Sequence, residues 1–252
     1  MPLHTPLPKK QPQTANHSET NPFVIARSVS DVAIHIIRTG FFSVNTLVVP
    51  LEEKACFVVD PAACKYSGDQ NRIIDYLHDK KLDCKAIILT HSHFDHITGI
   101  AQLKQAFPNA KIAIHKDEMS ELINPPGPMG EAVIRFFGSM ELIQAVAEQP
   151  QADIALYNGA TLDSAAGPGF GAENWKVIST PGHTPGSICL YNQNENTLIS
   201  GDTIFAYGGY GRTDMAGGDE AQIIHSLAML RETIPSGTHV YPGHDTDFVW
   251  GP

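Results

Sequence analysis

The stretch Thr90-His91-Ser92-His93-Phe94-Asp95-His96 directly follows the apolar run Ala86-Ile87-Ile88-Leu89. It places three imidazoles and one carboxylate within six residues. These groups are typical ligands of zinc, iron or manganese, and a cluster of them is costly to bury without a cation. The alternative is a polar surface loop that happens to be rich in histidine. We favour a metal site because similar clusters recur later in the chain.

Three further polar clusters each follow a short apolar strand. They are Pro181-Gly182-His183-Thr184-Pro185-Gly186, Gly201-Asp202 and Pro242-Gly243-His244-Asp245. Asp60, before Pro61, closes another predicted strand in the same way. Strand ends that point the same way bring their loops to one edge of a sheet, where sites are commonly assembled. We therefore expect these polar residues to meet.

The predicted donors are more numerous than one tetrahedral ion needs, and they suit two ions that share a carboxylate and a water. His91 and His93 are separated by one residue, so in an extended segment both side chains point to the same side. Asp95 and His96 come after the predicted turn, which assigns them to a second ion, and Asp202 is the natural bridge. Because the bridge is Asp rather than Cys, iron and manganese remain alternatives to zinc. The full set is His91, His93, Asp95, His96, His183, Asp202 and His244.

Composition indicates a globular protein of ordinary make-up. The chain has 252 residues, of which 42% are hydrophobic and 17% charged, enough for one large domain or two small ones. The net charge of −10 argues against nucleic acid as a partner, and no apolar run approaches the length of a membrane span. No secretory signal is visible, and the cysteines form no Cys-x-x-Cys pair. We expect reduced core thiols and a cytoplasmic location.

The pattern of apolar residues predicts an α/β fold with some antiparallel pairing. Residues 1–22 are rich in proline and polar residues, which predicts a disordered tail ahead of one domain over residues 23–252. Asp69 and Thr98 are predicted to cap helices, and Asp219 with Gln222 is typical of a capping box. The predicted strands are Val32–Ile37, Thr46–Val49, Cys56–Asp60, Lys85–Thr90, Lys111–Ile114, Trp175–Thr180, Ser187–Tyr191, Thr197–Ser200 and His239–Tyr241.

Residues 119–172 interrupt this rhythm as a helical insertion. The breaker Asn124-Pro125-Pro126-Gly127-Pro128 precedes a predicted helix over residues 130–147, whose apolar residues fall on one face. Packing in the core is the favoured interpretation of that face. The functional alternative is a cap that covers a pocket. The apolar residues are Val133, Phe136, Phe137, Met140, Ile143 and Ala147.

The motifs His-x-His-x-Asp-His, Gly-His-Thr-Pro-Gly, Gly-Asp and a final Gly-His resemble the metallo-β-lactamase superfamily over residues 23 to 247. The resemblance implies a four-layered αβ/βα sandwich with its site at one edge of the two sheets. It implies two divalent metal ions, zinc in the first place, and an orienting role for Asp60. It assigns His91, His93 and His183 to the first ion and Asp95, His96 and His244 to the second, with Asp202 between them.

Within the superfamily, Gly211-Arg212-Thr213-Asp214 and Gly217-Gly218-Asp219 are similar to glyoxalase II-like hydrolases, which cleave thioesters such as S-lactoylglutathione. Arg212 falls where that group places a basic residue near the substrate; the alternative for it is a surface ion pair. The chain departs from classical glyoxalase II in ending eight residues after His244 and in the insertion. The acyl group, the part played by glutathione and the oligomeric state therefore stay open. Asp202, where the commonest zinc β-lactamases use Cys, counts against antibiotic hydrolysis.

The resemblance implies hydrolysis of a small-molecule thioester or ester by a metal-bridging hydroxide, with Asp95 as a proton acceptor. A persulfide dioxygenase is the main rival, because His96-Ile97-Thr98-Gly99 and Gly-Arg-Thr-Asp also occur in that family. It would use one iron, with His91, His183 and Asp202 as ligands. A lactonase, with its acyl chain under the helix at 130–147, is the second rival. A binding protein without activity is disfavoured because no donor is missing.

Overall fold

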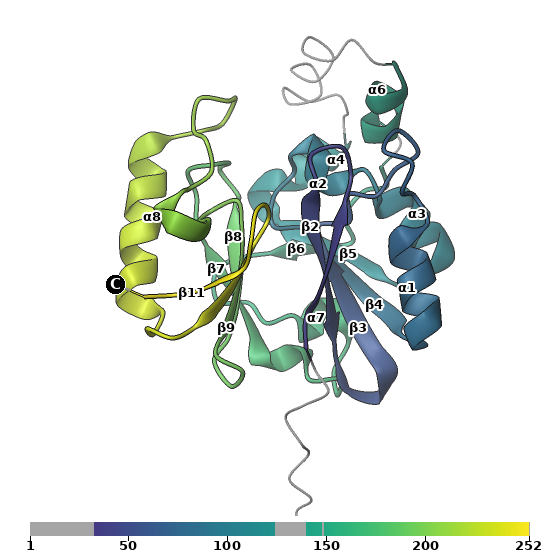
Figure 1. The fold of residues 1–252 in the computed structure, drawn as a ribbon, viewed down its shortest axis with the longest axis horizontal. Coiled ribbons are helices and arrows are strands. Elements are labelled where there is room, and N and C mark those ends of the chain that lie inside the picture. Colours follow the sequence, from purple (N-terminus) through teal and green to yellow (C-terminus); the bar gives the residue numbers. More distant parts are fainter. Residues whose placement is uncertain (1–32, 124–139, 148, 252) are drawn as a thin grey trace, which may run out of the picture. The chain divides into compact units, whose positions relative to one another are not determined.

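Two β-sheets face each other in the computed structural model, which describes residues 33–123, 140–147 and 149–251 (Figure 1). The predicted tail at residues 1–22 lies outside the described residues. In the described part of the chain, no helix combines the length and the apolar character that crossing a membrane requires.

The first sheet has six strands, and each pairs with its neighbours in sequence. The pairs β1–β2 and β2–β3 are antiparallel, whereas β3, β4, β5 and β6 run parallel. Strands in the parallel part are covered on both faces, and accordingly all five residues of β3 are buried. The bounds are β1 His35–Thr39, β2 Val44–Pro50, β3 Ala55–Val59, β4 Asp83–Ile88, β5 Lys111–His115 and β6 Ile154–Leu156.

The second sheet has five strands in the order β11-β10-β9-β8-β7. Only β9 and β10 are parallel, and the other three pairs are antiparallel. The bounds are β7 Trp175–Ser179, β8 Ile188–Asn192, β9 Thr197–Gly201, β10 His239–Pro242 and β11 Phe248–Val249.

Helices cover the outer faces of both sheets, and α1 and α3 lie on one side while α8 lies on the other (Figure 1). One apolar cluster joins α1 and α3 to the first sheet, and another joins α8 to the second. The cluster between the sheets contains Phe57 and Trp175, whose rings meet edge to face at 5.5 Å. This arrangement confirms the predicted αβ/βα sandwich. The helices are α1 Arg72–Lys80, α2 Phe94–Ile97, α3 Ile100–Ala106, α4 Met119–Ile123, α6 Met140–Ala147, α7 Asp163–Ala166 and α8 Glu220–Thr233.

Two of the three predicted helix caps are wrong. Asn71 stands at the N-cap of α1, because the Asp69 carboxylate instead accepts the backbone N–H groups of Gly40 and Cys64. Gly99 stands at the N-cap of α3, because the Thr98 hydroxyl donates to a carbonyl in another loop. In both cases the side chain forms a hydrogen bond with another loop instead of capping the helix that follows it. The third prediction is confirmed as an N-cap, since Asp219 accepts the N–H of Gln222 at 3.0 Å. The reciprocal bond of a capping box does not form, because the Asp219 N–H donates to the Gly182 carbonyl.

The strand leading to the first histidine cluster ends earlier than predicted, at Ile88 rather than Thr90. The backbone N–H of Thr90 donates to the Asp60 carboxylate at 2.8 Å instead of continuing the sheet. Asp60 itself has a positive φ of 49°, which turns the chain sharply after β3. Thr90, two residues beyond the end of β4, is therefore held by a side chain rather than by sheet pairing.

Part of the predicted insertion helix is present as α6, which spans Met140–Ala147. Leu142 and Val146 pack into the cluster between the first sheet and its helices, so this segment contributes to the core. The predicted face is wrong here, since Ile143 is half-buried and Ala147 is exposed. Val133, Phe136 and Phe137 lie outside the described residues. The insertion also adds β6, which extends the first sheet by pairing with β5.

Candidate metal centre

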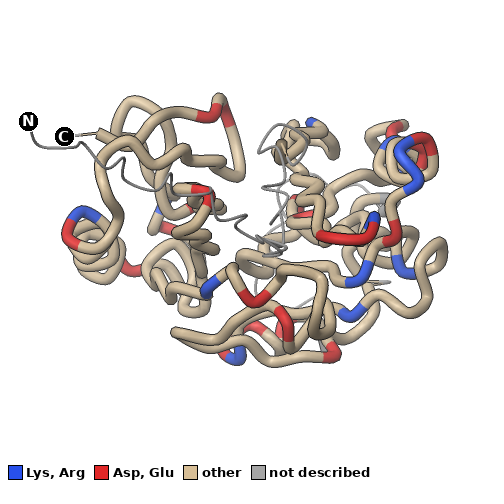
Figure 2. The backbone as a smooth tube through the Cα atoms, turned by 90° about the horizontal axis from the view of Figure 1, so that it is seen from below, with Lys and Arg blue, Asp and Glu red and all other residues tan. Residues whose placement is uncertain are grey.

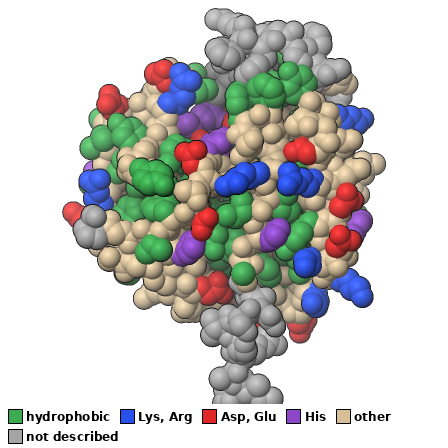
Figure 3. All heavy atoms as spheres, viewed as in Figure 1, with side chains coloured by type: hydrophobic (Ala, Val, Ile, Leu, Met, Phe, Trp, Pro, Cys, Tyr) green, Lys and Arg blue, Asp and Glu red, His purple; other side chains and the backbone are tan. Residues whose placement is uncertain are grey.

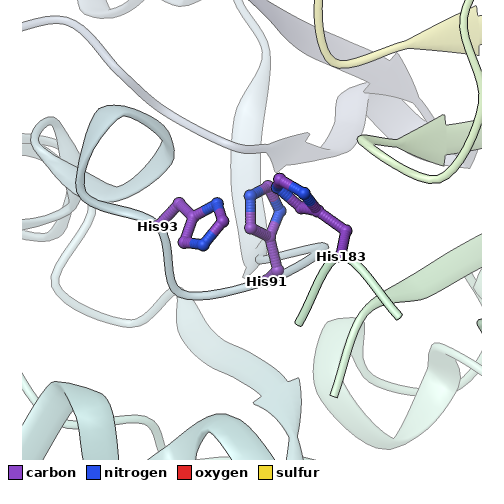
Figure 4. A group of neighbouring side chains, drawn as sticks. All are labelled: His91, His93 and His183. Carbon is purple, nitrogen blue, oxygen red and sulfur yellow. The ribbon is translucent and has the colours of Figure 1, made fainter. Parts of the chain in front are cut away.

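Three imidazoles converge from both sheets at the edge where they meet (Figure 4). His91 and His93 follow β4, whereas His183 lies in the loop between β7 and β8. Their ring centroids are 4.3 to 4.9 Å apart. One nitrogen from each ring lies within 4.8 Å of one from each other ring, and all three residues are buried. We call these residues the first group.

Asp95, His96 and His244 form a second group with the same 4.8 Å spacing of donor atoms. Asp95 and His96 are on the short helix α2, and His244 follows β10 of the other sheet. The Nε2 atoms of the two rings are 3.3 Å apart, and Asp95 Oδ2 is 3.4 Å from that of His244. Each group therefore combines residues from both sheets.

Asp202, after β9, lies between the two groups. Its Oδ2 is 3.5 Å from His183 Nε2 in the first group and 3.7 Å from His244 Nε2 in the second. Its Oδ1 is 3.5 Å from His96 Nε2. One carboxylate thus faces both groups, as a shared ligand must. With it, all seven predicted donors lie in one cluster.

Several polar atoms of the cluster have no hydrogen-bond partner within the described part of the chain. They are buried Nε2 atoms of the first group and the Oδ1 atom of Asp202. Buried polar atoms are normally paired, and leaving one unpaired costs about 1–3 kcal/mol. Imidazole nitrogens and a carboxylate oxygen that point at one another without a proton between them fit a cation. The atoms are His91 Nε2, His93 Nε2, His183 Nε2 and Asp202 Oδ1.

The imidazoles of the first group favour the neutral form. Burial lowers the pKa of His91 well below its ordinary value, and the neighbouring imidazoles lower it further. Burial and then His183 lower the pKa of His93 to about 3. Burial also lowers the pKa of His183. Neutral imidazoles are the form that binds a metal, so no proton competes for these nitrogens.

The second group contains one carboxylate, Asp95, and lies beside that of Asp202, so its histidines favour the charged form. Burial works against a charged His96, but Asp202 and then Asp95 raise its pKa well above the ordinary value. Burial likewise opposes a charged His244, whose pKa is raised by its hydrogen bond to Asp95 and by Asp202. Burial favours a neutral Asp202, yet its histidine neighbours, His96 first, hold the pKa of this carboxyl well below its usual range. A cation would take the place of these protons.

The sequence model of the metallo-beta-lactamase superfamily matches residues 38–244. The chain belongs to this superfamily. A probable metallo-hydrolase, YqgX of Bacillus subtilis (strain 168), is 30% identical over 80% of this chain and 90% of its own length. A hydroxyacylglutathione hydrolase of Pelagibacter ubique (strain HTCC1062) is 29% identical over 84% of this chain and 70% of its own. The crystal structure of the B3 metallo-beta-lactamase BLEG-1 superposes with a TM-score of 0.72, at 29% identity, covering 86% and 94% of the two chains.

In this metallo-β-lactamase superfamily member, Asp60 orients the histidine-bearing loop. Its Oδ1 accepts the Thr90 N–H, while its Oδ2 accepts the Thr90 hydroxyl at 2.6 Å and lies 3.0 Å from His96 Nδ1. Thr90 Oγ1 is in turn 3.0 Å from His91 Nδ1. Because the Asp60 oxygens already serve these donors, the carboxylate fixes ring orientation rather than facing the cluster.

Asp60→Asn is expected to weaken metal binding by about 10- to 100-fold while leaving the fold intact. Asn tolerates the positive φ at this position, but its amide nitrogen cannot accept from either Thr90 or His96. Zinc titration against a chromophoric chelator measures the change. The exposed Asp75 of α1 gives the matched control, Asp75→Asn. Unchanged zinc affinity in Asp60→Asn would contradict the orienting role.

Sequence analysis missed Asn45, which is 2% exposed in β2. Its amide donates to the carbonyls of Pro242 and Asp245, both at 3.0 Å, and so ties the His244 loop to the first sheet. The neighbouring Gly243 has no room for a side chain, since a Cβ there would lie 2.2 Å from Asp202 Oδ1. An Asn inside an apolar strand was the available signal, because Asn is disfavoured in strands.

Arg212 contributes to the cluster through its backbone. Its carbonyl oxygen is 2.7 Å from His183 Nδ1, which orients that ring. The guanidinium is exposed and forms two hydrogen bonds to the Asp214 carboxylate, at 2.6 and 2.7 Å. The structure therefore places the Arg212 side chain in a surface ion pair, the alternative considered from the sequence. Its role toward a substrate stays a prediction.

Proposed function

We propose that this protein hydrolyses a thioester or ester of a small molecule at a centre of two divalent cations, zinc in the first place and iron or manganese as alternatives. The observation that carries the proposal is the position of Asp202, which faces both donor groups. The similarity to a hydroxyacylglutathione hydrolase supports the choice of a thioester. Whether glutathione is part of the substrate is left to experiment.

The first group and the second group would each hold one cation, with Asp202 between them. When bound, two such cations lower the pKa of a shared water and polarise the scissile carbonyl. The protein's own residues fix the rings: Thr90 lies against His91 Nδ1, Asp60 against His96 Nδ1, and the Arg212 carbonyl against His183 Nδ1. Each ring is thereby left with Nε2 directed into the cluster.

Asp95 is proposed as the proton acceptor. Its Oδ2 lies 3.4 Å from Nε2 of His244, whose side chain is 24% exposed and is the most accessible of the five rings in the cluster. Asp95 is itself partly exposed, so a proton that it takes up has a short route to solvent. This role supplements its place in the second group.

Aromatic side chains beside the cluster support an apolar acyl group in the substrate. Phe42, in the turn between β1 and β2, contacts Phe94 of α2 edge to face at 5.8 Å. Phe205 contacts the His244 ring at 6.2 Å. Figure 3 shows histidine side chains at the surface in the upper part of this face, with hydrophobic side chains on either side. Apolar walls around a few polar groups are typical of small-molecule sites.

Charge supports a small molecule rather than nucleic acid or a membrane as the partner. The net charge is −10, and in Figure 2 Lys and Arg are interspersed with Asp and Glu along the described backbone. Nucleic-acid binding needs a concentrated basic surface. All four cysteines are free and buried, which supports the proposed cytoplasmic location.

Metal content and substrate choice together test the proposal. We expect two zinc or iron ions per chain and turnover of thioesters such as S-lactoylglutathione, followed by release of a free thiol. Hydrolysis of acyl-lactones by a protein with two bound ions would support the proposed metal centre but contradict the proposed thioester substrate. One iron per chain, with oxygen consumed on a persulfide and no hydrolysis, would overturn the proposal in favour of a dioxygenase.

Arg212→Ala is expected to raise KM about tenfold for thioesters whose thiol part carries a carboxylate, because a charge-assisted hydrogen bond is lost. KM for a thioester of an uncharged thiol should stay within a factor of two. The Arg212 carbonyl that orients His183 remains in the variant, so zinc affinity should not change. Steady-state kinetics on the matched pair of substrates measures the effect. Equal changes for both substrates would exclude a carboxylate-binding role for this side chain.

A further inference from the structure

Glu118 is a buried carboxylate that spans two of the loops carrying the proposed ligands. It ends the short 3-10 helix η2, Lys116–Glu118, directly after β5, and only 2% of it is exposed. Sequence analysis gave no signal for it, since an acidic residue in the stretch Lys116-Asp117-Glu118 looks like part of a solvated turn. The structure instead places its carboxylate inside the protein, where it accepts hydrogen bonds.

The two carboxylate oxygens of Glu118 serve different loops. Oε2 accepts the backbone N–H of Ser92 at 3.0 Å and also the Ser92 hydroxyl. Oε1 accepts the backbone N–H of Gly186 at 2.8 Å. Ser92 stands between His91 and His93, and Gly186 is three residues after His183. One side chain therefore joins the two loops that make up the first group.

Gly186 is shaped to receive this carboxylate. A Cβ at Gly186 would lie 2.5 Å from Glu118 Cγ and 3.0 Å from its Oε1, so a side chain there would push Glu118 away. In the described part of the chain, the two loops are also joined by a backbone hydrogen bond from the Ile188 N–H to the Thr90 carbonyl at 3.0 Å. That bond joins the start of the His91 loop to the end of the His183 loop, whereas Glu118 joins Ser92, beside His93, to Gly186.

We propose that Glu118 is a positioning residue that sets the spacing of His93 and His183 and thereby the affinity of the first group for its cation. The inference rests on the proposed metal centre. It is selective, because the second group takes its orientation from Asp60 and its loop contacts from Asn45, neither of which hydrogen-bonds to Glu118. Residues that hold ligands in place without touching the metal commonly contribute 10- to 100-fold to affinity.

The test separates the two groups by removing a ligand from one of them. His244→Ala leaves the first group complete, and His183→Ala leaves the second complete. Glu118→Gln is introduced into each metal-free protein, and zinc is titrated against a chromophoric chelator. Gln keeps the side-chain length, but its amide nitrogen must face donors at either Ser92 or Gly186. We expect affinity to fall about 10- to 100-fold in the His244→Ala background and by less than twofold in the His183→Ala background.

Two further variants guard against a general loss of folding. Ser92→Ala removes one hydroxyl donor and should produce a smaller loss with the same selectivity. Glu121→Gln, three residues along in α4, is the matched control and should change neither affinity. Equal losses in both backgrounds, or no loss in either, would overturn the role of Glu118. Failure of both parent backgrounds to bind zinc would instead overturn the proposed metal centre, and this inference with it.

Discussion

Asp202→Ala lowers kcat/KM for thioester hydrolysis by about 10³-fold or more if the proposed centre is correct. The substitution removes the only carboxylate within 4 Å of both groups in the described part of the chain. It leaves the rings of His96, His183 and His244 without the negative charge that balances two cations. Two measurements are needed: steady-state kinetics, and metal content by elemental analysis, which should fall from two ions per chain to one or none.

Asp202→Asn tests whether the negative charge itself is required, because asparagine keeps the shape of the side chain and one of its oxygens but is uncharged. It should lose nearly as much activity as the alanine variant. Asp83→Ala is the control: its carboxylate pairs with Lys85 at 2.7 Å and is 61% exposed, so the kinetics should stay within a factor of two. Activity of Asp202→Ala within tenfold of the parent protein would refute the assignment of this site.

Zinc is expected to raise the melting temperature of the metal-free protein by about 10 °C. Zinc at about 1,000 times its dissociation constant adds about 4 kcal/mol, and each kcal/mol is worth about 2–4 °C for a domain of this size. The physical source is the set of buried donor atoms without hydrogen-bond partners, together with the carboxylates around Asp202. Differential scanning calorimetry on the metal-free protein, with and without zinc, measures the shift.

The ion and the variant supply separate controls for this shift. Magnesium prefers six oxygen ligands and should leave the melting temperature unchanged at the same concentration. His183→Ala, which lacks a ligand of the first group, should keep less than half of the zinc shift. A zinc shift of the same size in His183→Ala would show that zinc binding at the first group does not contribute to the stabilisation.

The candidate site was predictable from sequence because its donors stand in short, dense motifs after apolar strands. His91, His93 and His96 lie so close in sequence that any fold bringing the other strand ends to the same edge must gather them. Strand ends carrying His183 and His244 could be found from apolar runs alone, and the αβ/βα layering followed from the resemblance. These features depend on local pattern, which a single sequence contains.

The residues that hold the ligands could not be predicted in the same way. Glu118 and Asn45 act on loops that are 68 and about 200 residues away in sequence, so no spacing rule connects donor and acceptor. The wrong caps at Asp69 and Thr98 have the same cause, since tertiary partners outcompeted the local backbone for their oxygens. Arg212 was noticed for its charge, while its backbone carbonyl proved to be the atom beside His183.

Each sheet is built from one continuous segment of the chain. Residues 35–156 supply the strands of the first sheet, and residues 175–249 supply those of the second. Neither the first group nor the second group is complete within one half, because the first needs His183 and the second needs His244. A chain with only its first half folded therefore lacks one ligand of each proposed ion site. We expect the ions to bind late in folding, after the two halves have docked. Tight metal binding would therefore report that both halves are folded and in place.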